Sequence, residues 1–274
     1  VSNCYATGSI SSRPLGTNNP PNIPLKPEGH CYVTCNISGR AAVGGLVGGN
    51  LGTVTDCYSS SSVTGRVHVG GLVGRNGATV SNSYSTGNVD GDDYIGGLVG
   101  VNWGDLDEAS VSNSHSTGNV NGNEHIGGLV GRNIYCSVVN SYSISSVSGN
   151  SSVGGLVGWN EYTVSNCYAT GNVTGDKRVG GLAGDNTGTV SDSYSIGDVT
   201  GDERVGGLIG TTIYSTVTDC YSTGSVTGNE YVGGLLGWWN PDYCTVSNCF
   251  WDTETSGQAT SAGGAGMNTT EMKD

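Results

Sequence analysis

The sequence predicts an all-β fold, a parallel β-solenoid (β-helix) of about ten coils of 26 residues. Gly supplies 49 of the 274 residues, far too many for helices, and no helical period of apolar residues is present. A 26-residue period made only of strands and turns is best satisfied by coils that stack on their neighbours. The repeated motif Gly-Gly-Leu begins at Gly44, Gly70, Gly96, Gly127, Gly154, Gly180, Gly206 and Gly233.

A second column of residues gives the number of coils. A small residue followed by an aromatic residue recurs between the Gly-Gly-Leu motifs, and each recurrence marks one coil. The column comprises Cys4-Tyr5, Cys31-Tyr32, Cys57-Tyr58, Ser83-Tyr84, Ser114-His115, Ser141-Tyr142, Cys167-Tyr168, Ser193-Tyr194, Cys220-Tyr221 and Cys249-Phe250.

Each coil is expected to contain three strands. The first surrounds Val-Gly-Gly-Leu-Val-Gly, the second Thr-Val-Ser-Asn-Cys-Tyr and the third Gly-Asn-Val-Thr-Gly. Strand side chains alternate between two faces, so Ser83, Ser85, Gly87 and Val89 should point inward, and Tyr84, Thr86 and Asn88 outward. An Asn column predicts a ladder of side-chain amides at a turn, since Asn tolerates left-handed backbone and can bond to adjacent coils. Its members are Asn50, Asn76, Asn102, Asn133, Asn160 and Asn186.

The chain divides into four segments. Residues 1–11 form a first partial coil, and residues 12–30, with five of the six prolines, form a loop or N-terminal cap. Residues 31–250 form the solenoid. Residues 251–274 are a non-repeat tail that should dock on the last coil or on a neighbouring molecule. Because the chain starts inside a repeat without Met, we expect a processed chain or a piece of a longer one.

Charge narrows the range of partners. The net charge is −13, and the ten Lys and Arg residues form no basic run, which argues against nucleic acid and anionic membrane surfaces. No run of apolar residues is long enough to insert into a membrane.

The segment Gly45-Leu46-Val47-Gly48 and its copies resemble the signature of GLUG-motif repeat proteins. The resemblance covers about residues 1–11 and 31–250, and residues 249–257 are similar to segments that close such arrays. It implies a β-solenoid in a secreted or cell-surface protein of bacteria or archaea, with an extracellular location. It implies no catalytic residues.

The nine cysteines are an odd number, so at least one lacks an intrachain partner. Either the cysteine column holds buried small residues, because Ser replaces Cys there, or adjacent coils form disulfides. The adjacent pairs are Cys4/Cys31, Cys31/Cys57 and Cys220/Cys249. Cys35, Cys136 and Cys244 lie outside the column and are candidates for cross-links between molecules.

No cofactor is expected. Acidic turns such as Asp92-Asp93, Asp176 and Asp202-Glu203 could hold Ca²⁺ between coils. Arg178 and Arg204 lie beside Asp176 and Asp202, so local charge pairing is the simpler explanation. The sequence contains no nucleophile elbow, zinc-binding helix motif or phosphate loop, and its four His residues occupy different columns. We therefore expect that the chain is not an enzyme.

Two further groups are candidate surface sites. Aromatic residues in the turn after the Asn column could contact a glycan, a protein partner or one another: Trp103, Tyr135, Tyr162, Tyr214, Trp238, Trp239 and Tyr243. Sequons for N-glycosylation occur at Asn36, Asn150, Asn172 and Asn268.

These features favour an extracellular structural protein that self-assembles into a cell-surface filament or sheath, with other copies of itself as partners. Solenoid ends expose strand edges, which can template head-to-tail growth. An alternative is an adhesin-type binding module or stalk that recognises a glycan or a protein. A third is an ice-binding solenoid, suggested by the column of Thr86, Thr117, Thr170 and Thr223, which Ile144 and Ile196 interrupt.

Overall fold

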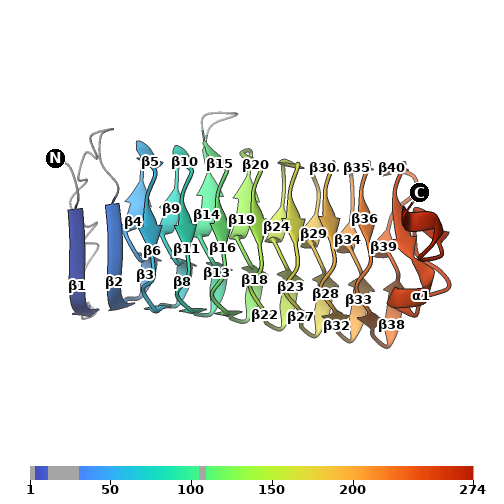
Figure 1. Ribbon diagram of the computed structural model, residues 1–274, viewed down its shortest axis with the longest axis horizontal. Coiled ribbons are helices and arrows are strands. Elements are labelled where there is room, and N and C mark those ends of the chain that lie inside the picture. The colour runs from blue at the N-terminus through green and yellow to red at the C-terminus, as the bar shows by residue number, and fades with distance from the viewer. Residues whose placement is uncertain (1–3, 12–30, 105–108, 274) are drawn as a thin grey trace.

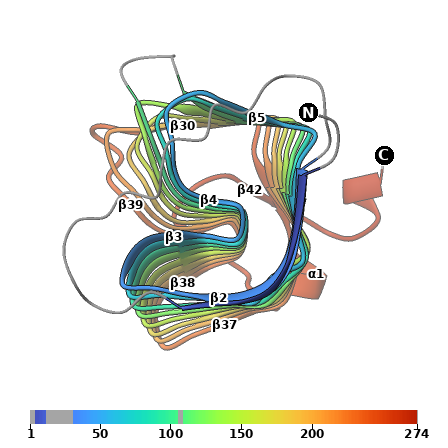
Figure 2. The same ribbon diagram turned by 90° about the vertical axis from the view of Figure 1, so that its left-hand side faces the viewer.

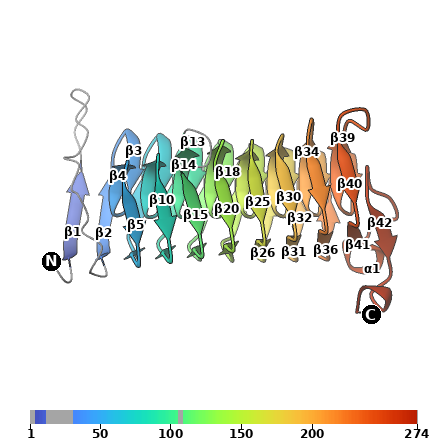
Figure 3. The same cartoon turned by 90° about the horizontal axis from the view of Figure 1, so that it is seen from above.

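The computed structural model describes residues 4–11, 31–104 and 109–273. The described chain is a parallel β-solenoid, a rod whose coils stack along its long axis (Figure 1). Strand β1 (Cys4–Ser11) lies at one end, and the short helix α1 (Thr253–Ser256) lies at the other (Figures 1 and 3). The predicted fold class is therefore confirmed.

The solenoid has about eight complete coils, so the predicted number of ten is too high. Three of its four walls contain eight strands each, and only the fourth continues beyond them at both ends. The cysteine and aromatic column lies in that longer wall. Counting it therefore included the partial coils at the two ends.

One coil contains five short strands rather than the predicted three. They are β8 (Val67–Gly70), β9 (Val73–Asn76), β10 (Thr79–Ser81), β11 (Tyr84–Ser85) and β12 (Val89–Asp90). The Val-Gly-Gly-Leu-Val-Gly segment turns back on itself, so it forms two strands instead of one. The end view shows two such strands, β3 (Ala41–Gly44) and β4 (Val47–Asn50), side by side in the middle of the coil (Figure 2).

Four in-register walls, sheets A to D, run along the rod. Sheet A contains β1, β2 (Cys31–Ser38), β6 (Tyr58–Ser59), β7 (Val63–Thr64), β11, β12, β16 (His115–Ser116), β17 (Val120–Asn121), β21 (Tyr142–Ser143), β22 (Val147–Ser148), β26 (Tyr168–Ala169), β27 (Val173–Thr174), β31 (Tyr194–Ser195), β32 (Val199–Thr200), β36 (Tyr221–Ser222), β37 (Val226–Thr227), β41 (Phe250–Asp252) and β42 (Ala265–Met267). Sheet B contains β3 (Ala41–Gly44), β8, β13 (Asp93–Gly96), β18 (Glu124–Gly127), β23 (Ser151–Gly154), β28 (Lys177–Gly180), β33 (Glu203–Gly206) and β38 (Glu230–Gly233). Sheet C contains β4 (Val47–Asn50), β9, β14 (Val99–Trp103), β19 (Val130–Ile134), β24 (Val157–Asn160), β29 (Ala183–Asn186), β34 (Ile209–Thr212) and β39 (Leu236–Trp239). Sheet D contains β5 (Thr53–Thr55), β10, β15 (Ser110–Ser112), β20 (Ser137–Val139), β25 (Thr163–Ser165), β30 (Thr189–Ser191), β35 (Thr216–Thr218) and β40 (Thr245–Ser247).

The turned-back segment divides the interior into two hydrophobic cores. Leu72 and Val73, which follow the two glycines, belong to the larger core with Val80 of sheet D. Val69, which precedes the glycines, belongs to the smaller core with Val63 of sheet A. The equivalent residues of successive coils belong to the same two clusters, so both cores run along the rod.

The glycines of the motif are required because backbone packs directly against backbone. A Cβ at Gly70 would lie 2.0 Å from the carbonyl oxygen of Val73, and one at Gly71 would lie 2.2 Å from that of Gly97 in the next coil. A Cβ at Gly74 would lie 2.7 Å from the amide nitrogen of Val43 in sheet B. Only Gly lets the two strands approach this closely.

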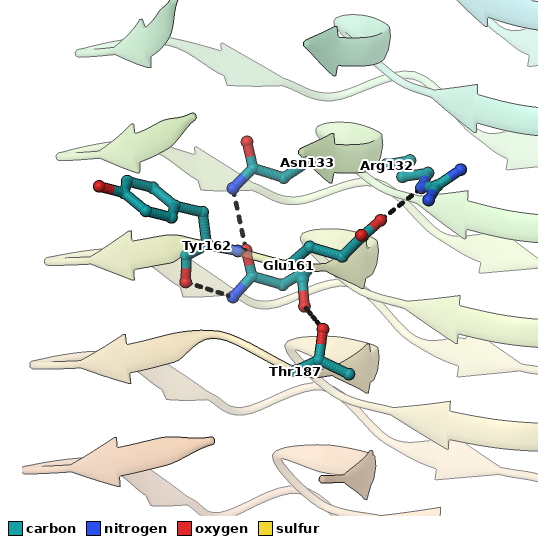
Figure 4. A network of polar contacts seen from close by, with 6 residues as sticks. Arg132, Asn133, Glu161, Tyr162 and Thr187 are labelled. Carbon is teal, nitrogen blue, oxygen red and sulfur yellow. Dashed lines mark hydrogen bonds and ion pairs between the residues drawn. The ribbon is translucent and has the colours of Figure 1, made fainter. Parts of the chain in front are cut away.

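The predicted faces and the Asn ladder agree with the structure. Ser83, Ser85, Gly87 and Val89 are buried, whereas Thr86 and Asn88 are exposed and Tyr84 is half-buried. From Asn50 to Asn160, each Asn donates its side-chain amide to the Asn oxygen one coil later, at 2.7–2.9 Å, and Asn186 donates to the hydroxyl of Thr212 at 3.1 Å. Figure 4 shows Asn133 within this ladder.

The predicted left-handed backbone belongs to two other columns. The first precedes the cysteine and aromatic column and includes Asn82 (φ 49°). The second precedes the Val or Ile of the motif and includes His68 (φ 56°) and Tyr94 (φ 56°). In the first column Asn and Asp bear this conformation at low cost, whereas most residues of the second are held in it by the turned-back segment.

Both ends of the solenoid depart from the repeat. β1 pairs in register with β2, from Cys4 opposite Cys31 to Ser11 opposite Ser38. The predicted loop or cap at residues 12–30 lies outside the described residues. The tail docks on its own last coil, where β42 pairs with β41. The tail also contains a single 3₁₀ turn, Glu271–Lys273. Among the described residues no helix is both long and apolar enough to cross a lipid bilayer.

Candidate functional site

Two columns of polar and aromatic side chains meet where sheets B and C lie side by side, and we call them the arginine–aromatic groove. One column comes from sheet B and contains His68, Tyr94, His125, Ser152, Arg178, Arg204 and Tyr231. The other comes from sheet C and contains Arg75, Val101, Arg132, Trp159, Asp185, Thr211 and Trp238. The groove holds four of the ten Lys and Arg residues of this acidic chain.

Stacking organises the groove. The rings of His68 and Tyr94 lie 5.4 Å apart between centroids, those of Tyr94 and His125 4.8 Å apart, and those of His125 and Trp159 5.2 Å apart. The guanidinium of Arg132 lies 4.2 Å from the Trp159 ring and 5.6 Å from the Tyr94 ring. These are cation–π distances, so the groove alternates aromatic rings with cations.

Ion pairs neutralise only part of this charge. Arg132 pairs with Glu161 at 2.6 Å (Figure 4), and Arg178 pairs with Asp185 at 3.2 Å. Arg75 forms no ion pair with any described residue and lies 5.3 Å from the Trp103 ring centroid. The charge of Arg75 is therefore available to an anionic ligand.

The two histidines of the groove are neutral at pH 7. Burial lowers the pKa of His68 to about 4, with help from the nearby Arg75 and Arg132. Burial also lowers the pKa of His125 to about 4, with Arg132 and Arg178 adding to the effect. The positive charge of the groove therefore comes from arginine alone.

Several buried polar atoms of the groove have no hydrogen-bond partner among the described residues. They include Nδ1 of His125, Nε1 of Trp159 and Oγ1 of Thr211. Polar groups of this kind are normally paired in native proteins. The groove is thus the part of the described solenoid where hydrogen bonding is least complete.

A pocket of about 220 Å³ lies within the groove. At this point Val101 replaces the longer side chains of its neighbours, since Arg75, Val101 and Arg132 occupy the same register position in successive coils. The lining residues are His68, Arg75, Tyr94, Val101, Trp103, Arg132 and Ile134.

A second feature is the tyrosine ladder on the outer face of sheet A. Successive ring centroids are 4.7–5.1 Å apart and the ring planes are within 7° of parallel. The rings cover one another's faces, so they cannot stack on a sugar, and the ladder mainly fixes the register of the coils. Its members are Tyr58, Tyr84, His115, Tyr142, Tyr168, Tyr194 and Tyr221.

The tyrosine ladder ends at a larger pocket of about 590 Å³ beside the C-terminal tail. Tyr221 and Phe250 line one side, and Met267 and Met272 of the tail line the other. Asp252 belongs to its lining but is fully engaged, because it accepts hydrogen bonds from the Thr269 hydroxyl and from the amides of α1. This carboxylate therefore organises the tail.

The predicted aromatic turn does not form one continuous edge. Tyr214 and Tyr243 contact each other, with ring centroids 4.8 Å apart, and Trp103 contacts Arg75. Tyr135 is exposed and Tyr162 half-buried. Trp238 lies under Arg204 in the groove, and Trp239 packs against the larger core. Both tryptophans are on β39, where side chains alternate between the two faces.

Cys31, Cys57, Cys167, Cys220 and Cys249 of the cysteine column are free thiols. Among these cysteines the alternative of disulfides between adjacent coils is therefore not realised, and the interpretation as buried small residues holds. The thiol of Cys57 donates to the carbonyl of Thr55 at 3.1 Å, as the hydroxyl of Ser83 does to Ser81 at 2.7 Å. Cys and Ser are therefore interchangeable here, and burial raises the pKa of Cys167 to about 12.

The off-column cysteines differ in accessibility. Cys35 and Cys136 are buried, whereas Cys244 is half-buried and contacts the hydroxyl of Ser215 at 3.5 Å. Cross-linking between molecules through these three residues stays a prediction. The side chain of Cys4 lies outside the described residues.

The acidic turns form ion pairs, but the predicted pairs of Asp176 with Arg178 and of Asp202 with Arg204 are not among the ion pairs of the described residues. Arg66 pairs with Asp92 at 3.0 Å and Arg204 with its neighbour Glu203 at 3.3 Å, whereas Arg178 pairs with Asp185 across the groove. Potential ligand atoms of Asp93, Glu124 and His125 lie within 4.8 Å of one another. Burial raises the pKa of Asp93, and the nearby Glu124 and Asp92 raise it further.

The four sequons are placed differently. Asn36, Asn150 and Asn172 are exposed on the solenoid. Asn268 is half-buried, and its side-chain oxygen accepts hydrogen bonds from the amides of Thr270 and Glu271. Glycosylation at the first three would therefore disturb the fold least.

Sequence reasoning missed the arginine–aromatic groove. Its residues vary from coil to coil, so no repeated letter marks the columns, unlike the Asn and Tyr ladders. One signal was present: four Arg residues, Arg75, Arg132, Arg178 and Arg204, are either two residues before Gly-Gly or directly before the ladder Asn.

Stacked coils, side-chain ladders and two continuous cores define a β-solenoid repeat protein. The family model described as the GLUG motif matches residues 39–64, 65–90, 91–121, 122–148, 149–174 and 201–227. These matches cover more than half of the 274 residues, so the chain belongs to the GLUG-motif family. Residues 175–200, between two matches, form a coil of the same kind. No curated protein and no solved structure matches the chain.

Proposed function

We propose that this chain is an extracellular, non-enzymatic rod that serves as a stalk or binding module of a cell-surface protein. The observation that carries this proposal is the continuous strand pairing along all four walls, which the Asn and tyrosine ladders reinforce. A solenoid with such ladders transmits force and holds a fixed length, because each coil is bonded to both neighbours.

The Asn ladder supports this mechanical role. Asn133 accepts from Asn102 at 2.8 Å, and it donates to Asn160 at 2.9 Å and to the carbonyl of Cys136 at 2.6 Å. All three amides are fully buried. A slip between coils would leave these groups unpaired, at a cost of about 1–3 kcal/mol for each group.

The C-terminal tail favours a separate rod over a filament. Ser261 accepts hydrogen bonds from the amides of Leu235 and Leu236, and Gln258 donates to the carbonyl of Val226. The tail thereby occupies strand edges onto which a second molecule would have to stack. Growth of a filament from this end would require the tail to leave.

Negative-stain electron microscopy of the full chain, with and without reductant, tests this proposal. We expect separate short rods under both conditions, with sedimentation at the mass of one chain. Ordered filaments or sheaths would overturn the stalk proposal and support self-assembly. Filaments that loosen on reduction would further implicate Cys35, Cys136 or Cys244, which Cys→Ser variants would identify.

A further inference from the structure

The pocket beside Val101 has the features of a binding site for an anion. Val101 leaves a gap one coil wide between Arg75 and Arg132, which flank it in the same column. With strands about 4.8 Å apart, the two arginines are attached roughly 10 Å apart along the rod. Both guanidinium groups can therefore reach a ligand placed between them.

Charge inside this pocket is not fully balanced by the described residues. Arg132 already holds Glu161, but Arg75 has no ion-pair partner among the described residues, and none of the residues that line the pocket is acidic. Both arginines help to lower the pKa of His68, which independently places their charges at the same pocket. An arginine fork matches the geometry of a carboxylate, which it can bind through two hydrogen bonds.

Aromatic surface beside this charge favours a sugar. Tyr94 is enclosed between His68 and His125, so its faces are not available. Trp103 is 46% exposed at the rim and is the ring that a ligand can reach. The volume of about 220 Å³ suits one sugar ring rather than a longer segment.

We propose that this pocket binds one uronic-acid residue of an acidic polysaccharide. Arg75 and Arg132 hold the carboxylate, and the Trp103 indole supports the sugar ring. The net charge of −13 does not prevent this, because charges farther away than a Debye length, about 8 Å at physiological ionic strength, are largely screened. The inference goes beyond the proposed stalk role and does not depend on it.

The test is a titration of the full chain with trigalacturonate, followed by isothermal calorimetry and tryptophan fluorescence. We expect saturable one-site binding that weakens as NaCl is raised, and no binding of the methyl-esterified trisaccharide. Arg75→Gln should weaken binding about tenfold or more. Val101→Trp, which places in the gap the residue found at Trp159 and Trp238, should abolish it without changing the net charge.

The matched control is Arg66→Gln, which removes the same charge from an exposed residue outside the pocket. Its affinity should stay within about twofold of the wild type. The proposal is overturned if no saturable binding is seen up to about 10 mM, if the ester binds equally well, or if Arg66→Gln and Arg75→Gln weaken binding alike. Thermal melts of all three variants check that each is folded, and Arg75→Gln alone decides the question if Val101→Trp is not.

Discussion

At the scale of single residues, the solenoid uses a few side chains in environments that they seldom occupy. The rings of His68 and His125 stack on neighbouring aromatic rings beside arginine side chains, and both residues have left-handed backbone. Tyr94 and Tyr231 occupy the same column with similar φ angles. Four members of this column are therefore flat rings, and burial together with the nearby arginines keeps His68 and His125 neutral.

The neutral histidines predict a loss of stability in acid. Their pKa is about 4 in the folded chain, below the usual 6.5, so the unfolded chain binds more protons between these values. We expect the melting temperature to fall as pH drops from about 6.5 towards 4. The double variant His68→Tyr and His125→Tyr should lose much of this dependence, as measured by calorimetry across the pH range.

A matched substitution is His115→Tyr in the tyrosine ladder, where burial alone lowers the pKa of the histidine. It should change the pH dependence less than the double variant does, because no guanidinium group contributes there. An unchanged slope in the double variant would show that carboxylates, and not these histidines, govern stability in acid.

At the scale of elements, the stacking columns could be predicted from the sequence and the path of the chain within a coil could not. The inward Ser83 and the Asn50–Asn186 ladder were predictable because a solenoid repeats one environment at each register position. The turn between β8 and β9 was not predictable, because Gly-Gly can lie in an extended strand or in a turn. Backbone contacts from the adjacent strand, such as Gly74 against Val43, decide between them.

The groove and the thiols show the same limit at single sites. That Arg75 and Val101 share a column can be recognised only once the turn between β8 and β9 is known. The pocket arises because successive coils carry different side chains at this position. For the cysteines, the Cα spacing of stacked coils fits a disulfide, but the thiols of Cys57, Cys220 and Cys249 each donate to the carbonyl two residues before them. Register predicts which residues are neighbours, but it does not predict their rotamers.

The close backbone contacts of the turned-back segment predict that its glycines cannot be replaced without loss of stability. A Cβ at Gly128 would lie 2.1 Å from the carbonyl oxygen of Gly155 and 2.3 Å from the hydroxyl of Ser143. Gly128→Ala should therefore destabilise the fold by more than about 3 kcal/mol, as measured by urea unfolding.

The control for this prediction is Gly49→Ala, in the first coil. A Cβ at Gly49 meets no atom within 4 Å, so this change should leave stability unchanged or raise it by up to about 1 kcal/mol. Equal effects of the two substitutions would show that the close backbone contacts do not dictate glycine in the motif.

At the scale of the whole molecule, each inner coil is stabilised by two neighbours, whereas a terminal coil has one neighbour and an unpaired strand edge. At the C-terminus the tail covers this edge. Trp251 occupies the register position of Ser222, is 6% exposed, and donates its indole N–H to Gln258 at 3.0 Å. Thr260, Ser261 and Ala262 then bond to the edge of the last coil. The rod therefore ends in a cap that is part of its own chain.

Removal of this cap should turn the rod into a self-associating molecule. Deleting residues 257–274 frees the amides of Gly234, Leu235 and Leu236, which the tail otherwise satisfies. Unpaired parallel edges pair with other chains. Sedimentation velocity should show concentration-dependent dimers or longer assemblies, with a lower melting temperature. Deleting only residues 268–274 leaves Ser261 and β42 in place and should keep the chain monomeric. If the longer deletion is also monomeric, the tail does not protect the end, and the last coil must resist stacking through the shape of its own edge.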